Sequence, residues 1–389
     1  MLTQSNGVAA KVAQRPAEVI DRAGLGALIS LLQSDGYRVI GPQVGDGAIV
    51  YETLASADDL PAGWLDEQSP GHYRLVRGPD AAVFAHTVGP QGWKRVLFPP
   101  RQTLWEGERD GSQFSIEPAE IEAPPTVLLG VRACELAAIA IQDRVFLEGA
   151  YVDAGYAARR AALFIIAVNC ARSTSTCFCV SMQTGPKART GYDLALTELC
   201  GGGRHDFVIE AGTERGAEVI ERLERRAAGP EDLAAAAAAV ERAASTQTRA
   251  MPPDAEGILK ANLESTHWNE VASRCLNCTN CTLVCPTCFC STVEDVTDLG
   301  GDHFSRERRW DSCFTLDHSY IHGGSVRREG ASRYRQWLTH KLAHWHDQFG
   351  SSGCTGCGRC VAWCPVGIDI TAEVAAIAAA APAAPKDKR

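Results

Sequence analysis

The sequence predicts an α+β protein, in which an amino-terminal α/β domain is followed by a mainly helical domain. The α/β prediction depends on the order strand, helix, strand, because apolar runs at 126–131 and 163–168 flank a helical stretch at 136–147. The helical prediction depends on two cysteine runs, at 275–285 and 354–364, which have helical patterns before and between them.

Length and a proline pair indicate how the chain is divided. A chain of 389 residues is long enough for two or three domains. Pro252 and Pro253 follow an alanine-rich helical stretch and interrupt the helical pattern. We therefore expect an α/β domain at 19–250 and a helical domain at 255–380.

Composition and charge restrict the class of protein. The net charge of −9 argues against nucleic acid as the main partner. No apolar run approaches 18 residues, so we expect no membrane span, and residues 1–16 lack the apolar core of a secretion signal. We therefore expect a cytoplasmic protein, in which the spacing of the 16 cysteines indicates metal binding instead of disulfides.

The first hundred residues predict one helix and several short strands. Asp21 is a capping residue, and the leucines that follow at helical spacing predict a helix at 21–33. Glycine and proline separate the runs of β-forming residues that come next. These runs predict strands at 37–40, 48–51, 73–76, 82–86 and 95–98.

Two continuous apolar runs predict buried strands in the middle of the α/β domain. The runs at 126–131 and 163–168 are typical of strands that are covered on both faces. The segment between them is long enough for a parallel crossover. A third strand is predicted at 207–210, followed by helices at 216–228 and 232–245.

Four cysteines follow the ends of the two buried strands. Cys134 comes after the first strand, and Cys170, Cys177 and Cys179 come after the second. Loops at strand ends are where α/β sheets hold ligands, so these thiols are candidates for a metal site. The alternative is that they are plain buried thiols, because free cysteine is among the most buried residue types.

The strongest signal is a cysteine spacing that occurs twice. Residues 275–285 and 354–364 both read C-x2-C-x2-C-x3-C, with Pro286 and Pro365 next in the chain. This run binds [4Fe–4S] clusters in two-cluster ferredoxins, where the fourth cysteine of each run ligates the other cluster. We therefore predict two [4Fe–4S] clusters in a ferredoxin-like domain. Cluster I is expected on Cys275, Cys278, Cys281 and Cys364, and cluster II on Cys354, Cys357, Cys360 and Cys285.

Zinc is the alternative metal for these cysteines. Structural zinc sites commonly use paired C-x2-C units, whereas each run here has three evenly spaced cysteines and a fourth before proline. Gly356 and Gly358 lie inside the second run, where they let the backbone approach a cluster closely. With iron–sulfur clusters favoured, the four upstream cysteines become candidates for a third cluster.

The segment between the runs carries features beyond a ferredoxin. Cys288, Cys290 and Cys313 either line the clusters or are buried thiols. Apolar residues at helical spacing predict a helix with a core-facing stripe at 334–349, and a helix at 259–273 leads into the first run. The segment is also locally basic, which indicates a solvated face, charge compensation for anionic clusters, or a docking surface.

Motifs for other chemistry are missing from the sequence. The glycines at 201–203 lack the strand–turn–helix setting of a dinucleotide site, and there is no P-loop. No triad or carboxylate pair is supported, so we expect no catalytic residue in this chain.

Segments on both sides of the cysteine runs resemble a known family and cover most of the chain. The chain resembles the beta subunit of soluble, sulfhydrogenase-type NiFe hydrogenases and the related A subunit of anaerobic sulfite reductase. The similar segments are GVRACE (130–135), VNC (168–170), CFCVSM (177–182), DLALTE (193–198), CPTCFC (285–290), RWDSC (309–313) and CPVGIDI (364–370). The family has proline where this chain has Ala133, a departure that affects no expected ligand.

The resemblance implies an electron-transfer subunit. In such complexes this subunit relays electrons between a flavin-containing, diaphorase-type subunit that reacts with NAD(P)H and a catalytic hydrogenase or sulfite reductase subunit. We expect the hydrogenase-type relay here, with catalysis in the partners. Three alternatives stay open. The chain could be the electron-transfer subunit of anaerobic sulfite reductase, or a reductase that itself acts on a sulfur compound or disulfide at Cys288, Cys290 or Cys313. The third alternative is a non-redox role, in which the clusters are a structural or sensing element.

Overall fold

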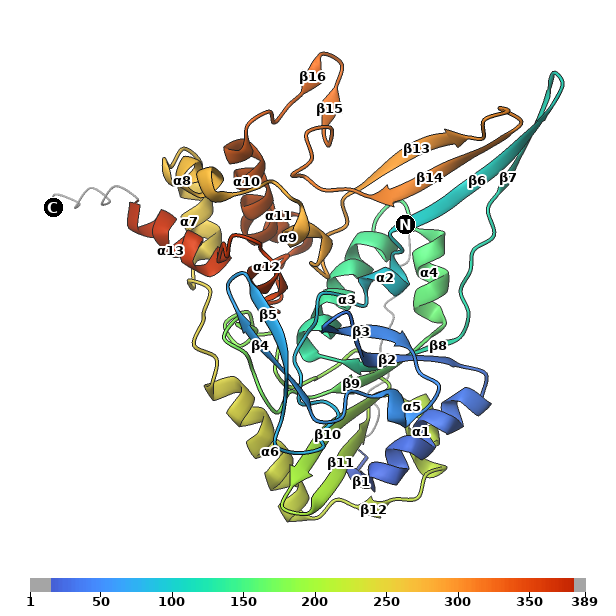
Figure 1. The fold of residues 1–389 in the computed structure, drawn as a ribbon, viewed down its shortest axis with the longest axis vertical. Coiled ribbons are helices and arrows are strands. Elements are labelled where there is room, and N and C mark those ends of the chain that lie inside the picture. The colour runs from blue at the N-terminus through green and yellow to red at the C-terminus, as the bar shows by residue number, and fades with distance from the viewer. Residues whose placement is uncertain (1–14, 381–389) are drawn as a thin grey trace, which may run out of the picture.

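The fold has three parts: a large sheet with its helices, a group of helices that carries the cysteine runs, and a smaller sheet that projects from both (Figure 1). The computed structural model describes residues 15–380, so most of the segment inspected for a secretion signal lies outside the described residues. The α+β fold class is confirmed. Within the described range, no helix is long and apolar enough to cross a membrane.

The large sheet has eight strands in the order β12-β1-β11-β10-β9-β8-β2-β3. Its strands are β1 (Glu18–Asp21), β2 (Arg38–Gly45), β3 (Ala48–Thr53), β8 (Thr126–Val131), β9 (Leu163–Val168), β10 (Leu194–Gly201), β11 (Arg204–Ala211) and β12 (Arg226–Ala227). The central strands β2, β8, β9 and β10 run parallel, and the outer pairs are antiparallel. Every residue of β8 and β9 is buried, which confirms the predicted pair of buried parallel strands.

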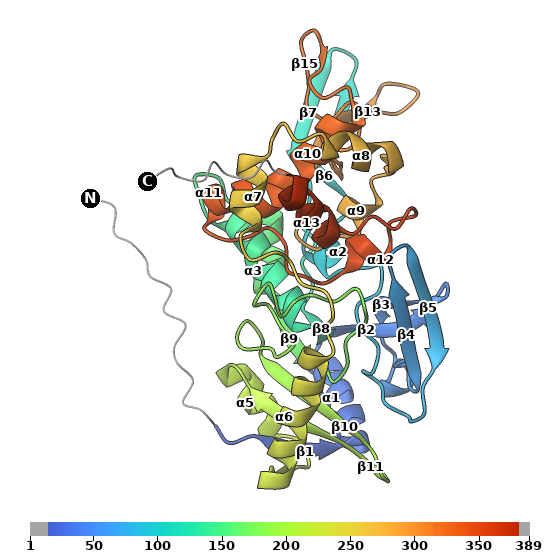
Figure 2. The same ribbon diagram turned by 90° about the vertical axis from the view of Figure 1, so that its left-hand side faces the viewer.

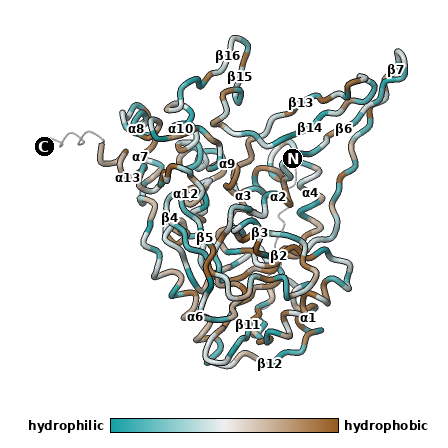
Figure 3. The backbone as a smooth tube through the Cα atoms, in the orientation of Figure 1, coloured by the Kyte–Doolittle hydropathy of each residue, from teal (hydrophilic) through white to brown (hydrophobic). Residues whose placement is uncertain are grey.

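Helices cover both faces of this sheet, and alternate strand residues point to each face. Val127 and Leu129 of β8 pack toward α1 (Arg22–Ser34) and α5 (Glu214–Glu221). Leu128 and Val131 pack toward the opposite layer, which consists of α2 (Lys94–Leu97), α3 (Ala133–Leu147) and α4 (Ala154–Ala161). Figure 3 shows the resulting core as hydrophobic segments through the middle of the sheet. A further helix, α6 (Pro230–Ser245), packs on β10 and β11.

The helical part holds the two cysteine runs. Its helices are α7 (Ala255–Ala261), α8 (His267–Arg274), α9 (Asn280–Leu283), α10 (Gly330–Thr339), the π-helical turn η2 (His340–His344), α11 (Trp345–Phe349), α12 (Arg359–Ala362) and α13 (Ile370–Ala380). Tyr334, Trp337, Leu338, Leu342 and Trp345 are all buried, which confirms the predicted core stripe. Figure 2 shows these helices at the opposite end of the molecule from β10 and β11.

Two smaller sheets connect the parts. The hairpin β4 (Trp64–Ser69) and β5 (His72–Arg77) reaches the helical part, where Gly71 N donates to Val361 O at 3.0 Å (Figure 2). The projecting sheet has the order β13-β14-β6-β7. Its strands are β6 (Arg101–Asp110), β7 (Gln113–Pro118), β13 (Ser291–Thr297) and β14 (His303–Trp310), so an early and a late hairpin join edge to edge. A short hairpin, β15 (Tyr320–Ile321) and β16 (Gly324–Ser325), follows.

Several predicted elements are wrong or incomplete. Residues 82–86 form a buried loop instead of a strand, because buried side chains take the place of a partner strand: Glu198 accepts from Val83 N and Phe84 N, at 2.7 and 2.8 Å. Residues 95–98 lie mainly in the short helix α2.

Two predicted helices are interrupted. The one expected at 259–273 is divided into α7 and α8, and the one expected at 216–228 ends at Glu221 before the short strand β12. The strands of the projecting sheet were not predicted.

Candidate iron–sulfur centres

The structure brings the eight predicted ligands together around two cavities. Cavity I is lined by the thiols expected for cluster I, and cavity II by the thiols expected for cluster II, including the fourth cysteine that crosses over from the other run. The cysteines are Cys275, Cys278, Cys281 and Cys364 at cavity I, and Cys285, Cys354, Cys357 and Cys360 at cavity II. Cys360 also borders cavity I, so the two cavities are neighbours.

The two runs fold into the same loop from different residues. The third and fifth positions have positive φ in both: Asn277 at 51° and Thr279 at 69° in the first run, Gly356 at 65° and Gly358 at 77° in the second. Positive φ is common for glycine, tolerated by asparagine, and strained for a β-branched threonine. The strain at Thr279 indicates that the cysteine positions, not local preference, determine this backbone.

Backbone groups inside these loops are directed at sulfur. Asn277 N donates to Cys275 Sγ at 3.4 Å, and the equivalent Gly356 N donates to Cys354 Sγ at 3.5 Å. Such N–H donors stabilise negative charge on a ligating thiolate and raise the potential of a bound cluster.

Unpartnered polar atoms around the cavities test whether a cluster fits. Tyr334 Oη and Trp337 Nε1 are buried without a hydrogen-bond partner among the described residues, and both side chains line cavity I. Thr355 Oγ1 and Arg359 Nη1 are also buried without a hydrogen-bond partner among the described residues, and both residues line cavity II. Buried donors are normally satisfied, and the inorganic sulfides of an iron–sulfur cluster are acceptors. Four thiols and unpartnered donors at each cavity therefore fit a [4Fe–4S] cluster.

The arrangement differs from a zinc site. Between residues 15 and 380, no three His, Cys, Asp or Glu side chains are placed to hold a single metal ion. Thiols spread around a cavity suit a cube of several atoms better than one tetrahedral ion.

The four upstream cysteines lie in one region of the structure. Cys134 lies at the start of α3, Cys170 follows β9, and Cys177 and Cys179 lie in the next loop. Cys134 and Cys179 pack in the same small buried cluster. Burial raises the pKa of each of these thiols, to about 11 for Cys177 and about 12 for Cys179. The buried Arg132 guanidinium donates to Phe84 O and His86 O, at 2.8 and 2.7 Å. Its charge opposes the effect of burial on the pKa of Cys170, so a cation lies near this cysteine group.

The upstream cysteine group touches the wall of cavity II. Cys357 packs against Cys134 and Cys179, and Phe178 N donates to Gly356 O at 2.9 Å. A Cβ atom at Gly356 would lie 2.7 Å from Cys179 Cα. The second run therefore needs glycine at this position for close approach as well as for backbone conformation.

A buried ion pair joins the same two sites. Glu135 follows Cys134 in sequence, and Arg359 lies between Cys357 and Cys360. Their side chains are 1% and 0% exposed, and Arg359 Nη2 donates to Glu135 Oε1 at 2.5 Å. No pattern in the sequence indicates this pair, because the partners are more than 200 positions apart and neither belongs to a ligand motif.

A buried lysine lies beside cavity II. Lys341, in the π-helical turn η2, is 5% exposed, and its Nζ donates to Cys285 Sγ at 3.3 Å and to Thr287 Oγ1 at 3.1 Å. Of the explanations for the basic segment, charge compensation of an anionic cluster fits this residue. Arginines on β14 instead pair with acids such as Asp295 and Asp153, as expected for a partly solvated face.

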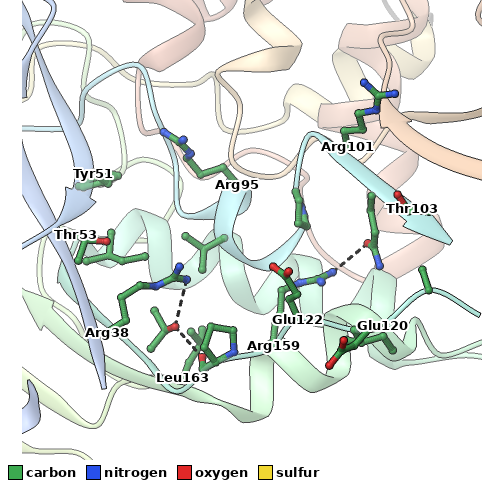
Figure 4. Close-up of a pocket in the computed structure, with 18 of the residues that line it drawn as sticks. Arg38, Tyr51, Thr53, Arg95, Arg101, Thr103, Glu120, Glu122, Arg159 and Leu163 are labelled. Carbon is green, nitrogen blue, oxygen red and sulfur yellow. Dashed lines mark hydrogen bonds between the residues drawn. The ribbon is translucent and has the colours of Figure 1, made fainter. Parts of the chain in front are cut away.

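A larger cavity lies away from the cysteines. It has a volume of about 650 Å³ and lies beside β2, β3, β6 and the start of β8 (Figure 4). Arginines and glutamates both line it, among them Arg38, Arg95, Glu120 and Glu122. Its mixed charge selects no particular ligand.

Comparison with known proteins identifies the class of this protein and then its family. Residues 274–368 match the family described as 4Fe-4S dicluster domain, so the chain is an iron–sulfur protein. It is 31% identical, over 337 residues, to sulfhydrogenase 2 subunit beta of Pyrococcus furiosus, a match that covers 85% of this chain and 90% of the relative. The chain therefore belongs to the family of sulfhydrogenase beta subunits, as the resemblance predicted. No solved structure matches the chain significantly.

Proposed function

We propose that this chain is the electron-relay subunit of a cytoplasmic, sulfhydrogenase-type complex. In the proposed complex, electrons pass between a flavin-containing, diaphorase-type subunit and a catalytic hydrogenase subunit. The observation that carries the proposal is the unbroken series of cysteine sites through the chain: the upstream cysteine group contacts cavity II, and cavity II shares Cys360 with cavity I. Neighbouring one-electron sites in contact are what a relay requires.

The proposed cofactors are two [4Fe–4S] clusters, on the ligand sets lining the two cavities, and a third cluster on Cys134, Cys170, Cys177 and Cys179. The third cluster is supported by the packing of Cys134 against Cys179, by the burial that raises the pKa of all four thiols, and by the nearby buried Arg132. A cluster that is ligated by four thiolates is an anion, so it would compensate the charge of the buried Arg132 guanidinium. Without such an anion, this buried charge would be poorly compensated.

One end of the proposed relay lies at the surface. Cys278 is exposed, and the neighbouring Leu276 and Val366, which also line cavity I, are 62% and 39% exposed. An apolar rim around an exposed ligand suits contact with a partner subunit. Cluster I is therefore the proposed point of exchange with one partner.

The ligand assignment is tested by Cys278→Ser, with Cys200→Ser as the matched control, since Cys200 on β10 belongs to none of the proposed sites. Iron content and a redox titration by electron paramagnetic resonance are measured on the full chain. We expect Cys278→Ser to lose much of the cluster I iron and signal, and Cys200→Ser to match the wild type. Full iron and an unchanged spectrum in Cys278→Ser would refute the assignment.

The partners are tested by isolating the complex under anoxic conditions. Co-purification of a flavin-binding subunit and a nickel-containing subunit is expected. A sirohaem-containing partner would instead support the sulfite reductase alternative.

A further inference from the structure

A cavity lies directly beside the upstream cysteine group. It has a volume of about 630 Å³ and is lined by α3 and by the loop 180–191. This loop folds back over the cysteines, because Thr184 N donates to Cys179 O at 3.0 Å and Cys170 N donates to Pro186 O at 3.3 Å. The cavity and the cysteine group therefore share one wall.

That shared wall is made of small residues. Gly185 lines the cavity, and a Cβ atom added to it would lie 3.0 Å from Cys179 Sγ and 3.3 Å from Ala133 Cβ. Glycine at this position therefore lets the backbone rest against the sulfur. Ala133, which precedes Cys134 in the chain, lines the same cavity. Any group that entered the cavity would be separated from the cysteine group by a single layer of small residues.

The two sides of the cavity are apolar. On α3, a face at helical spacing lines it: Ala133, Leu136, Ala137 and Ala140. Ala140 at the end of this face is exposed, and Val180 on the loop side is 43% exposed. A helix normally buries its apolar face. This face of α3 therefore has apolar surface left for a partner to cover.

The charged residues of the cavity are both basic. Lys187 and Arg189 line it and are exposed, and none of the described residues that line it is acidic. The chain as a whole has a net charge of −9, so this local excess of positive charge is opposite to the overall charge. Such a patch attracts an acidic surface and repels a basic one.

A relay needs contact with two partners, and cluster I at the surface provides one of them. The upstream cysteine group is at the other end of the series of sites. Cys134 and Cys179 are buried in this group, so a partner has to exchange electrons with it through a thin wall. The cavity offers such a wall, formed by Gly185 and Ala133.

We propose that this cavity is the docking site for an acidic segment of the second redox subunit, which exchanges electrons there with the upstream cysteine group. The inference rests on the proposed function, because it needs the third cluster and a partner that carries a flavin or a metal centre. One electron passes in each step: one centre is oxidised, the other is reduced, and no bond is formed or broken. The apolar sides favour a protein segment over a small anion, because only the larger partner buries them.

The docking is tested by the reactivity of Lys187 with N-hydroxysuccinimidyl acetate. The intact complex and the isolated full chain are treated under anoxia, and acetylated peptides are quantified by mass spectrometry. We expect acetylation of Lys187 to fall about ten-fold or more in the complex, and to recover at about 1 M sodium chloride, which screens charge attraction beyond about 3 Å. Lys260 is the internal control, because it is exposed on α7 and does not line the cavity.

Two variants test the charge and the shape of the cavity separately. Lys187→Glu reverses one charge, and Ala140→Trp fills space without changing charge. Each should lower the co-purified amount of one redox subunit about ten-fold, while the other subunit and the iron content stay at the wild-type level. The matched controls are Arg109→Glu on β6 and Ala237→Trp on α6, because both residues are exposed and neither lines the cavity. Equal losses in the variants and their controls would overturn the inference.

The outcomes separate this inference from the proposed function. A complex that holds both redox subunits but leaves Lys187 fully reactive would overturn the docking site and leave the relay standing. Protection of Lys187 in the isolated chain by inorganic phosphate alone would make the cavity a small-anion site and also overturn the docking site. Protection of Lys187 in a complex whose clusters cannot be reduced by titanium(III) citrate would support docking and contradict the relay.

Discussion

The buried pair Glu135–Arg359 gives the sharpest prediction about stability. Glu135 accepts hydrogen bonds from Arg359 Nη2 at 2.5 Å, Trp93 Nε1 at 3.1 Å and Arg132 N at 3.1 Å. The substitution Glu135→Gln keeps the size of the side chain but turns one acceptor oxygen into a donor. It leaves a fully buried guanidinium facing an amide, and donor faces donor at one of these contacts.

The magnitude follows from the burial of both partners. Removing one member of a buried ion pair costs about 3–5 kcal/mol, because the remaining charge is left uncompensated. At an unfolding entropy of about 2.1 cal/mol/K per residue, a chain of 389 residues loses about 1.2 °C of Tm per kcal/mol. We therefore expect the Tm of Glu135→Gln to fall by about 4–6 °C.

The assay is thermal unfolding of the purified chain, followed by circular dichroism, for a set of four variants. Glu135→Gln and Arg359→Met are the single changes, and the double variant removes both charges, so it should recover much of the loss. Glu67→Gln is the control, because Glu67 pairs with Arg74 at the exposed surface and should change Tm by about 1 °C or less. Single variants within 1 °C of the wild type, or a double variant as unstable as the summed singles, would refute the reasoning.

Three further predictions concern the cysteine sites. Lys341→Met should lower the potential of cluster II, on the order of 100 mV, since it removes a buried cation that donates to its ligand at 3.3 Å; a redox titration measures it. Gly358→Ala should lose more iron and more stability than the control Gly36→Ala. Both glycines have positive φ, but only at Gly358 would the added Cβ atom have neighbouring atoms within 4 Å. Equal losses in the two variants would contradict this. Cys290 should react with iodoacetamide at a nearly constant rate from pH 8 to pH 6, since its pKa is about 4, whereas burial raises the pKa of Cys200 and its rate should fall.

The parts of the fold that could be predicted are those encoded by local patterns. The spacing of each cysteine run is a short-range signal, and so is the apolar content of β8 and β9. The stripe from Tyr334 to Phe349 was readable from helical periodicity, although its π-helical turn at Lys341 was not.

The parts that could not be predicted depend on partners distant in sequence. The loop 82–86 has strand-like residues, but Glu198 and Arg132 satisfy its backbone, so it needs no partner strand. The contact of Cys290 with Asp311 depends on the pairing of β13 with β14, whose polar residues give little strand signal. The sequence alone therefore drew attention to Cys288, Cys290 and Cys313 but did not predict where they lie in the fold.

The arrangement of the upstream cysteine group could be predicted only in part. Two strand ends were enough to predict that Cys134 and Cys170 would be near each other, because β8 and β9 are parallel neighbours. Contact of this group with Cys357 was not predictable, since it depends on how the helical part docks on the sheet.

The projecting sheet has a consequence for how the chain is made. The pairing of β6 with β14 brings Arg101 against residues synthesised more than 200 positions later. At a synthesis rate of about 5–20 residues per second, β14 is made roughly 10–40 seconds after the β6–β7 hairpin. During that time its pairing edge is open, which is the state in which strands join the wrong chain. Nascent chains of this protein should therefore be most prone to aggregation before residue 310 emerges, and slower synthesis should make this worse.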